Sequence, residues 1–238
     1  MTDDDVIEED HAQRMVEPLD NPIWFALTTE HCLLARSHGL ARRYPSDVSP
    51  LAALLHPTSD AFADLRRLVS PGEHVALFTA GPLDVPGDWH LDRCRWIDQM
   101  ICEASLEPPN ASPVALGTTD VPEMLALTAA TDPGPFLPQT ILMGSYFGIR
   151  ANDGRLVAMA GERLQSTAFA EISAVCTHPE FRGRGYARAL VTFLAAQILA
   201  AGKTPFLHVK SENGAKVVYQ KIGFRLRAAM YLTVISVR

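Results

Sequence analysis

The sequence lacks the residue spacings that mark structural metal sites. Its four cysteines form no C-x-x-C pair, and its eight histidines show no H-x-x-x-H pattern. A long apolar segment is also missing, because the longest one, around residues 189–201, is interrupted by Thr192 and Gln197. Acidic residues stand at the start of the chain, where a secretory signal would carry positive charge. We therefore expect no metal, no membrane partner and a cytoplasmic location.

A basic excess is missing as well. The formal net charge is −6, with 27 acidic and 21 basic residues, and six of the acids lie within residues 3–10. The rest of the chain therefore carries 21 charges of each sign. Nucleic-acid-binding proteins usually carry a strong basic excess, so we expect no nucleic-acid partner.

The residues that are present suffice for a well-packed protein. Hydrophobic residues make up 47% of the 238 positions, which predicts a core that needs no disulfide bonds. The clearest break in composition is "SLEPPNASP", residues 105–113, with three prolines and little that could pack. It predicts an N-terminal α/β lobe over residues 1–112, with a frayed acidic start, and a second domain over residues 113–238.

The N-terminal part shows mixed helix and strand patterns. Asn21-Pro22 is typical of a helix start and predicts a helix within residues 21–38, and a second helix is predicted over 59–69. Residues 74–81 and 90–103 have strand patterns. No group of residues in this part points to a chemical function.

The second part is more regular. It predicts a helix over residues 121–131, a hairpin whose turn is Asn152-Asp153-Gly154, and a strand over 168–179. Helices over 185–201 and 213–223 then alternate with strands over 205–210 and 224–237. This order indicates an α/β or α+β fold.

The stretch "THPEFRGRGYARAL", residues 177–190, joins a predicted strand to a predicted helix. A glycine-rich turn at a helix start presents free backbone N–H groups, which bind anions such as a pyrophosphate. Gly183 and Gly185 permit unusual backbone angles, and Arg182, Arg184 and Arg188 add positive charge. The alternative is an ordinary helix start with solvated arginines.

Two other phosphate-binding motifs do not match. The third glycine of a dinucleotide fingerprint beginning at Gly183 would fall on Arg188. The first glycine of a P-loop ending at residues 202–204 would fall on Gln197, and that segment ends a helix instead of starting one.

Residues 182–187, read with His178-Pro179-Glu180 before them, resemble the R/Q-x-x-G-x-G/A coenzyme A signature of the GCN5-related N-acetyltransferases (GNAT), and most closely the FR47-like branch. The segment "VVYQKIGF", residues 217–224, resembles the family's second signature, a tyrosine followed by a Gly-Phe turn. The resemblance covers about residues 113–238. It implies a mixed central sheet flanked by helices, preceded here by a smaller lobe that we interpret as a degenerate copy of similar topology.

The resemblance also implies that acetyl-CoA is a co-substrate, held without a metal. The strand before the loop would pair with the pantetheine arm, and backbone N–H groups of the loop would hold the pyrophosphate. The matching residues are Val175, Cys176, Thr177, Arg182, Gly183, Arg184, Gly185, Tyr186, Ala187 and, at the edge, Arg188. An asparagine often stands seven residues before the family's tyrosine; that position is Glu212 here, so we take Asn213 as a shifted contact.

Acyl transfer to an amine needs a group that removes the amine proton. Glu171 is the candidate base, because it lies four residues before Val175, on the same face of a regular strand, and matches a glutamate of many relatives. The alternative for Glu171 is a carboxylate that faces solvent or pairs with an arginine. Glu162 is the reserve base, and His178 is a weaker candidate.

Tyr219 matches the family's proton donor to the leaving thiolate, and the alternative is an ordinary half-buried tyrosine. Cys176 invites an acyl-cysteine mechanism, but a strand cysteine is usually a small apolar residue. We therefore expect direct transfer of an acetyl group from acetyl-CoA to a primary amine, on a small molecule or a peptide. The rival interpretations are a non-catalytic acyl-CoA-binding module and an interaction scaffold, and a homodimer is left open.

Overall fold

The computed structural model describes residues 17–104, 106 and 113–238 of the chain. Its helices, 3-10 turns left aside, are α2 (Pro22–Thr28), α3 (Ser59–Arg66), α4 (Val121–Thr131), α5 (Tyr186–Ala200) and α6 (Lys216–Ile222). Its strands are β1 (Arg36–His38), β2 (Ala41–Arg43), β3 (Ala52–Leu54), β4 (His74–Thr79), β5 (Trp89–Cys102), β6 (Val114–Leu116), β7 (Tyr146–Arg150), β8 (Leu156–Gln165), β9 (Phe169–Thr177), β10 (Thr204–Lys210) and β11 (Phe224–Val237). Within these ranges, every helix is too short or too polar to cross a lipid bilayer.

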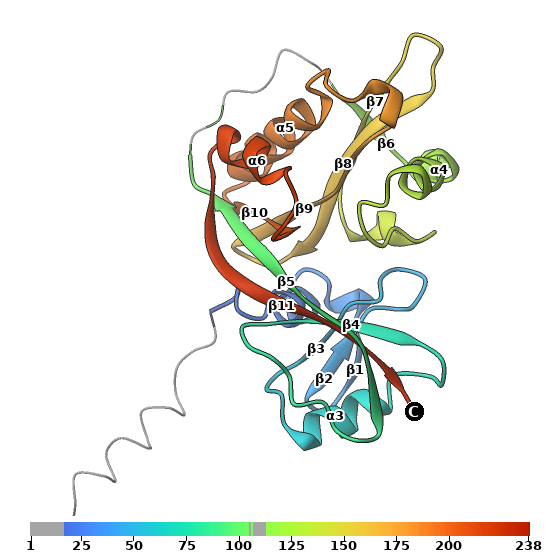
Figure 1. The fold of residues 1–238 in the computed structure, drawn as a ribbon, viewed down its shortest axis with the longest axis vertical. Coiled ribbons are helices and arrows are strands. Elements are labelled where there is room, and N and C mark those ends of the chain that lie inside the picture. The colour runs from blue at the N-terminus through green and yellow to red at the C-terminus, as the bar shows by residue number, and fades with distance from the viewer. Residues whose placement is uncertain (1–16, 105, 107–112) are drawn as a thin grey trace, which may run out of the picture.

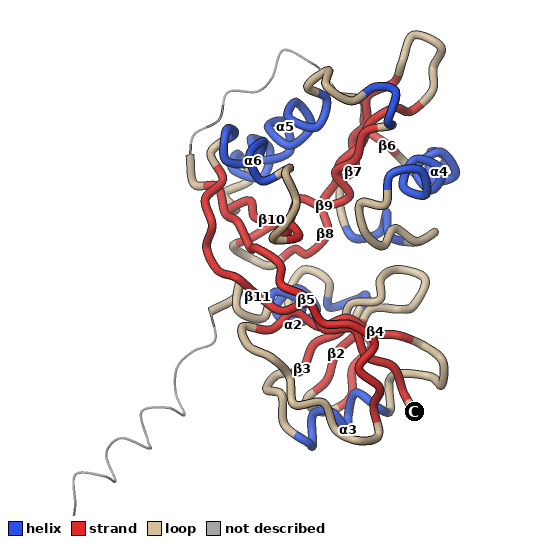
Figure 2. The backbone as a smooth tube through the Cα atoms, viewed as in Figure 1, coloured by secondary structure: helices blue, strands red, loops and turns tan. Residues whose placement is uncertain are grey.

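One large mixed sheet organises the molecule (Figures 1 and 2). Its eight strands lie in the order β4-β11-β5-β10-β9-β8-β7-β6, and β1, β2 and β3 form a separate three-stranded sheet. Neighbouring strands of the large sheet are antiparallel except β9 and β10, which are parallel. Helices flank this sheet, which confirms the predicted mixed α/β fold.

Helices cover both faces of the C-terminal part of the sheet. The apolar side of α5, with Leu190, Val191 and Leu194, packs with Tyr219 and Ile222 of α6 on one face. Met124 and Leu127 of α4 pack against strand residues in a different cluster, which covers the other face. Both clusters follow from apolar residues at helical spacing.

The first part of the chain forms a smaller lobe with a similar order of the main elements. It runs α2, a 3-10 turn, β1, β2, β3, α3, β4 and β5, and the later part runs α4, a 3-10 turn, β7, β8, β9, α5, β10, α6 and β11. Among the described residues, β6, which precedes α4, and the helix between the last two strands have no counterpart in the first lobe, where residues 80–88 take the place of that helix. The order of helices and strands in the first lobe is therefore consistent with the prediction of a degenerate lobe of similar topology.

The two lobes exchange their last strands. The C-terminal half of β5 pairs with β10 (Phe206 opposite Ile101), while the C-terminal half of β11 pairs with β4 (Val75 opposite Ile235). β5 and β11 also pair with each other along their length, from Phe224 with Cys102 to Val237 with Trp89. This arrangement has an approximate two-fold relation, and Figure 1 shows β5 and β11 running from one lobe into the other.

Most predicted elements are present, and one prediction was wrong in part. The helix predicted within residues 21–38 ends at Thr28, and β1 follows after a 3-10 turn. The hydroxyls of Thr28 and Thr29 donate hydrogen bonds to the carbonyls of Trp24 and Phe25, at 2.8 and 2.6 Å, where the helix stops. Such local bonds compete with helix continuation.

The predicted boundary at residues 105–113 lies almost entirely outside the described residues. The sheet contains strands from both sides of it, since β4 and β5 precede it and β6 to β11 follow it. The division into two domains stays a prediction.

Candidate functional site

The site is built where two parallel strands diverge. β9 and β10 pair only at their beginnings, where residues 169–171 lie opposite residues 204–206. Beyond Glu171 the two strands separate, and their backbone N–H and carbonyl groups no longer pair with one another. An extended ligand can add to such an opened strand edge.

A β-bulge bends β9 inside this opening. Ala174 has φ of 52°, and the pairing with β8 shifts between Ser173–Gly161 and Cys176–Met159. Val175 consequently packs in the same cluster as Ala170 and Ile172, although regular alternation would place it on the opposite face. Our expectation that Glu171 and Val175 share one face is therefore wrong, because the bulge interrupts the alternation between them.

The loop after β9 has the backbone that the glycines were predicted to permit. Gly183 and Gly185 have φ of 77° and 79°, in the left-handed region. A Cβ at either position would meet no other atom within 4 Å, so backbone angle and not crowding requires glycine there. Among the described residues, the N–H groups of residues 183–188 have no backbone or side-chain acceptor, as expected at a helix start.

A cavity of about 430 Å³ lies in front of this loop. It is lined by Val175, Cys176 and Thr177, by residues 182, 183 and 185–188, and by Asn213 and Tyr219. All predicted coenzyme-contacting residues except Arg184 thus line one cavity. Arg184 instead lies over the ring of Phe181, with its guanidinium carbon 4.7 Å from the ring centre.

Several polar atoms face this cavity without protein partners. The Thr177 hydroxyl oxygen is buried and has no hydrogen-bond partner among the described residues. The Asn213 side-chain oxygen accepts a hydrogen bond from the Ala215 N–H at 2.9 Å, which leaves its amide group free. An unpaired buried polar atom is costly, so the Thr177 hydroxyl indicates a place for a polar ligand, and the Asn213 amide is exposed beside it.

Burial keeps two further lining residues uncharged. It raises the pKa of Tyr219 to about 12, and this side chain is 9% exposed. Burial also raises the pKa of the Cys176 thiol to about 11. At neutral pH the site therefore presents a phenol and a thiol.

Glu171 lies outside the cavity, in a buried polar cluster. Its carboxylate accepts two hydrogen bonds from Arg163, at 2.8 and 2.5 Å, and one from His208 Nδ1 at 2.7 Å. The side chain is fully buried. Burial alone would raise the pKa of Glu171, but Arg163 and then His208 outweigh it and lower the pKa to about 2. Its role as a base stays a prediction, and these contacts favour the alternative of a carboxylate paired with an arginine.

The other two candidate bases have different surroundings. Glu162 is half-buried and accepts hydrogen bonds from the Ser145 N–H at 3.1 Å and the Gln165 amide at 3.2 Å. No cationic side chain pairs with it in the described part of the chain. His178 follows β9, and its Nδ1 atom is buried without a hydrogen-bond partner there.

Sequence reasoning missed the cluster around Glu171. His208 Nε2 lies 3.1 Å from the Gln99 side-chain nitrogen, and that amide group also donates to the Leu19 carbonyl at 2.8 Å. The Gln99 oxygen accepts from Arg227 at 3.0 Å, which fixes the amide orientation. The Gln99 amide nitrogen therefore faces His208 Nε2, while His208 Nδ1 faces the Glu171 carboxylate. Alternation along β10 places His208 on the same face as Phe206, and that was the only signal for it.

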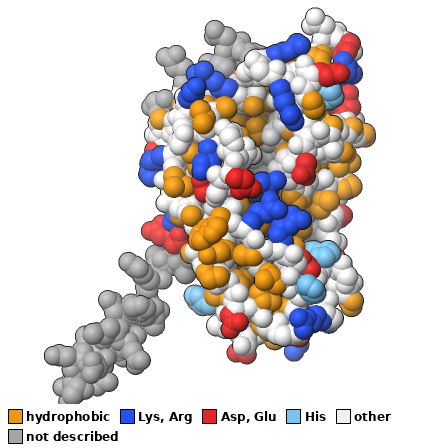
Figure 3. Space-filling view, in the orientation of Figure 1, with side chains coloured by type: hydrophobic (Ala, Val, Ile, Leu, Met, Phe, Trp, Pro, Cys, Tyr) orange, Lys and Arg blue, Asp and Glu red, His pale blue; other side chains and the backbone are white. Residues whose placement is uncertain are grey.

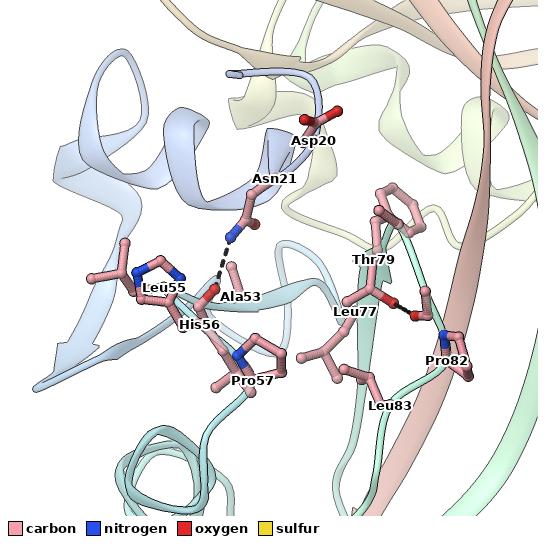
Figure 4. A pocket seen from close by; sticks show the side chains of 14 residues that line it. Asp20, Asn21, Ala53, Leu55, His56, Pro57, Leu77, Thr79, Pro82 and Leu83 are labelled. Atoms are coloured by element: carbon pink, nitrogen blue, oxygen red, sulfur yellow. Dashed lines mark hydrogen bonds between the residues drawn. The ribbon is translucent and has the colours of Figure 1, made fainter. Parts of the chain in front are cut away.

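A second cavity, of about 300 Å³, lies in the N-terminal lobe and was also not foreseen (Figure 4). On the molecular face that Figure 3 shows, basic and acidic side chains are interspersed. The described residues contain no group of three or more His, Cys, Asp and Glu side chains arranged to hold a metal.

Comparison with known proteins identifies the family. The model of the family described as FR47-like protein matches residues 146–233. A solved structure from Novosphingobium aromaticivorans, assigned as an acetyltransferase of the GNAT family, is 37% identical, with a TM-score of 0.85; the match covers 93% of this chain and 99% of that one.

More distant structures share the fold. A GCN5-related N-acetyltransferase-like protein from Streptococcus suis is 16% identical, with a TM-score of 0.60 and 94% of each chain covered. A GCN5-related N-acetyltransferase from Kribbella flavida is 17% identical, with a TM-score of 0.58, covering 85% of this chain and 88% of that one. A search of curated proteins gave no match. With its opened β9/β10 pair, its glycine loop and a 37% identical relative, the chain belongs to the GNAT family of acetyltransferases, in its FR47-like branch.

Proposed function

We propose that this protein is an acyl-CoA-dependent N-acyltransferase that moves an acetyl group from acetyl-CoA to a primary amine by direct attack. The observation that carries the proposal is the cavity between β9, the glycine loop and α6, which unites the free N–H groups of residues 183–188 with Tyr219.

The cavity residues fit the coenzyme in chemistry and order. The N–H groups of residues 183–188 and the nearby Arg182 and Arg188 suit a pyrophosphate. The opened edge of β9 at Val175 and Thr177 suits the amide groups of a pantetheine arm. Bound acetyl-CoA would supply a thioester whose carbonyl carbon accepts the amine nitrogen while the carbon–sulfur bond breaks.

Glu162 is our proposed acceptor of the amine proton, acting directly or through water. It contacts Ser145, in the segment 131–146, and we propose that this segment lines the acceptor pocket. Glu171 is already bound to Arg163 and His208 and acts as a positioning residue instead. It fixes β9 to β10 at the point where the two strands begin to separate.

Tyr219 donates the proton that the leaving sulfur requires. Its hydroxyl is protonated at neutral pH, and burial moves its pKa further from neutrality, to about 12. The backbone N–H of Val175, in the bulge, stabilises the negative charge that develops on the carbonyl oxygen. Burial of Cys176 keeps its thiol protonated, which favours direct transfer over an acyl-cysteine route.

The acceptor is an amine on a small molecule or a peptide, and we place the reaction in the cytoplasm. Phe136 and Tyr146, whose rings pack edge to face, are buried apolar residues of the segment 131–146. An acceptor screen that measures coenzyme A release would identify the amine.

Binding of the coenzyme can be tested before the acceptor is known. Coenzyme A at a hundred times its Kd adds about 2.7 kcal/mol of stability, which thermal unfolding detects. No shift at millimolar coenzyme would favour an interaction scaffold. A shift without turnover across the amine screen would favour a non-catalytic acyl-CoA-binding module.

A further inference from the structure

The cavity of the N-terminal lobe lies between the ends of β3 and β4 (Figure 4). Its volume is about 300 Å³, and much of its lining is apolar, with Leu54, Leu77, Phe78 and Leu83. Among the described residues that line it, none is lysine or arginine, and the ionisable ones are Asp20 and His56. Asp20 already pairs with Arg227, at 2.7 Å. The cavity therefore suits an uncharged ligand.

This cavity corresponds, in the topology of its lobe, to the coenzyme cavity. β3 and β4 are parallel, like β9 and β10, and α3 connects them as α5 connects the other pair. They touch at a single bridge between Leu51 and Ala76 and then separate. Each cavity lies where its parallel pair has opened.

The opened pair leaves backbone groups for a ligand. The Ala76 N–H donates to the Pro50 carbonyl at 2.9 Å, so the backbone groups of Ala76 face β3. Phe78, two residues further, has the same orientation, and no described residue of β3 pairs with it. The Leu54 carbonyl faces the same opening and accepts a hydrogen bond from the Asn21 amide at 2.7 Å (Figure 4). An extended chain with amide groups could bond to this edge.

The anion-binding part of the coenzyme site has no counterpart here. Only residues 55–58 join β3 to α3, without glycine or arginine. The Thr58 hydroxyl caps the helix by accepting from the Ala61 N–H at 3.3 Å. A pyrophosphate would therefore find neither the free loop N–H groups nor the charge that it finds before α5.

We propose that this cavity is a second ligand site, which binds a short uncharged chain with amide groups between β3 and β4. This inference rests on the proposed function only in one respect, the analogy with binding of a pantetheine arm between β9 and β10. Two sources supply such a chain, a pantetheine-type molecule and a short peptide, and the two are distinguished by separate probes.

The test is calorimetric titration of the full chain with pantetheine and, separately, with a dipeptide blocked at both ends. Saturating coenzyme A is present, so that the C-terminal cavity is filled. The blocking variant is Ala80→Trp, at an exposed position on the cavity rim, and the matched control is Asp84→Trp, exposed in the same loop but away from the lining.

We expect one of the two probes to bind the wild type and Asp84→Trp alike, and to bind Ala80→Trp at least tenfold more weakly. In the wild type, exchange of the backbone N–H groups of residues 77–80 should slow when that probe is added and should not change with the other probe. The proposal is overturned if neither probe binds, or if Ala80→Trp binds as the wild type does. If coenzyme A itself fails to bind, the probe titrations without it still decide this proposal, while the proposed function alone fails.

Discussion

Replacing Glu171 by glutamine should destabilise the protein strongly. The change leaves the Arg163 guanidinium buried without its carboxylate, which contacts it at 2.5 and 2.8 Å. Breaking a buried pair in this way costs about 3–5 kcal/mol, measurable by urea unfolding. Glu162→Gln is the matched control, because Glu162 is half-buried and no described cation pairs with it. Equal stability of the two variants would contradict the assigned ion pair.

The same pair predicts a pH dependence of stability. The pKa of Glu171 is lowered from 4.5 to about 2 in the folded protein, so the unfolded chain binds its proton more readily. The contribution of Glu171 is therefore complete above about pH 4.5 and is lost as the pH falls through about 2. The difference in unfolding free energy between the wild type and Glu171→Gln should shrink over that range. A difference that stays constant down to pH 2 would argue against this prediction.

Kinetics test the proposed roles of Glu162 and Tyr219. Loss of a general acid or base lowers kcat by about 10²–10⁴-fold, so Tyr219→Phe and Glu162→Gln should each fall in this range with coenzyme affinity retained. The fall in kcat for Tyr219→Phe should be constant up to about pH 11, because the wild-type hydroxyl has a pKa of about 12. If the Glu162→Gln variant turned over normally, the base would be Glu171 or solvent instead of Glu162.

At the residue scale, sequence reasoning located the loop residues better than the acid–base groups. Residues 182–188 are contiguous, so a local motif was enough to predict that they share one cavity, which all of them except Arg184 line; their contacts with the coenzyme stay a prediction. The partners of Glu171 come from two neighbouring strands, and His208 is 37 positions away. Local sequence patterns carry no information on such pairing. The bulge at Ala174 also places Val175 on the opposite face of the sheet from the one that regular alternation predicts.

At the scale of elements, the glycine loop should depend more on its backbone than on its charges. Gly185 is the N-cap residue before α5 and has φ of 79°, where a β-branched residue is strained by about 1–2 kcal/mol. Gly185→Val should therefore weaken coenzyme binding at least tenfold in a calorimetric titration. Arg184→Ala should have a smaller effect, because Arg184 lies over Phe181 and does not line the cavity. The reverse order would show that the loop binds mainly through its positive charge.

Helices and strands with strong patterns were predictable, and short ones were not. The expected strand over residues 224–237 has the bounds of β11, and the helix over 121–131 those of α4. Asp-Gly turn chemistry placed the hairpin between β7 and β8, where the Gly154 N–H donates to the Ala151 carbonyl. The three-residue strands β1, β2 and β3 have too few residues for alternation to be recognised.

At the scale of the whole molecule, the exchanged strands unite the two lobes in one sheet. β5 lies between β10 and β11 although it precedes the predicted boundary, and the sequence contains no local sign of this exchange. One apolar cluster also joins them, with Tyr44 and Phe78 packed with Phe206 and Met230. Both features depend on contacts between residues more than a hundred positions apart.

The exchange predicts that residues 113–238 do not fold alone. Without β5, the strand β10 has an open edge along residues 206–210, and β11 loses its partner from Phe224 to Val237. Open edges of this length favour aggregation. Expressed alone, the fragment should lack cooperative urea unfolding and coenzyme binding, and co-expression with residues 1–112 should restore both. The full chain should unfold in a single transition, because the same two strands complete both lobes. A fragment that binds coenzyme A and unfolds cooperatively would show instead that the boundary at residue 113 separates independent domains.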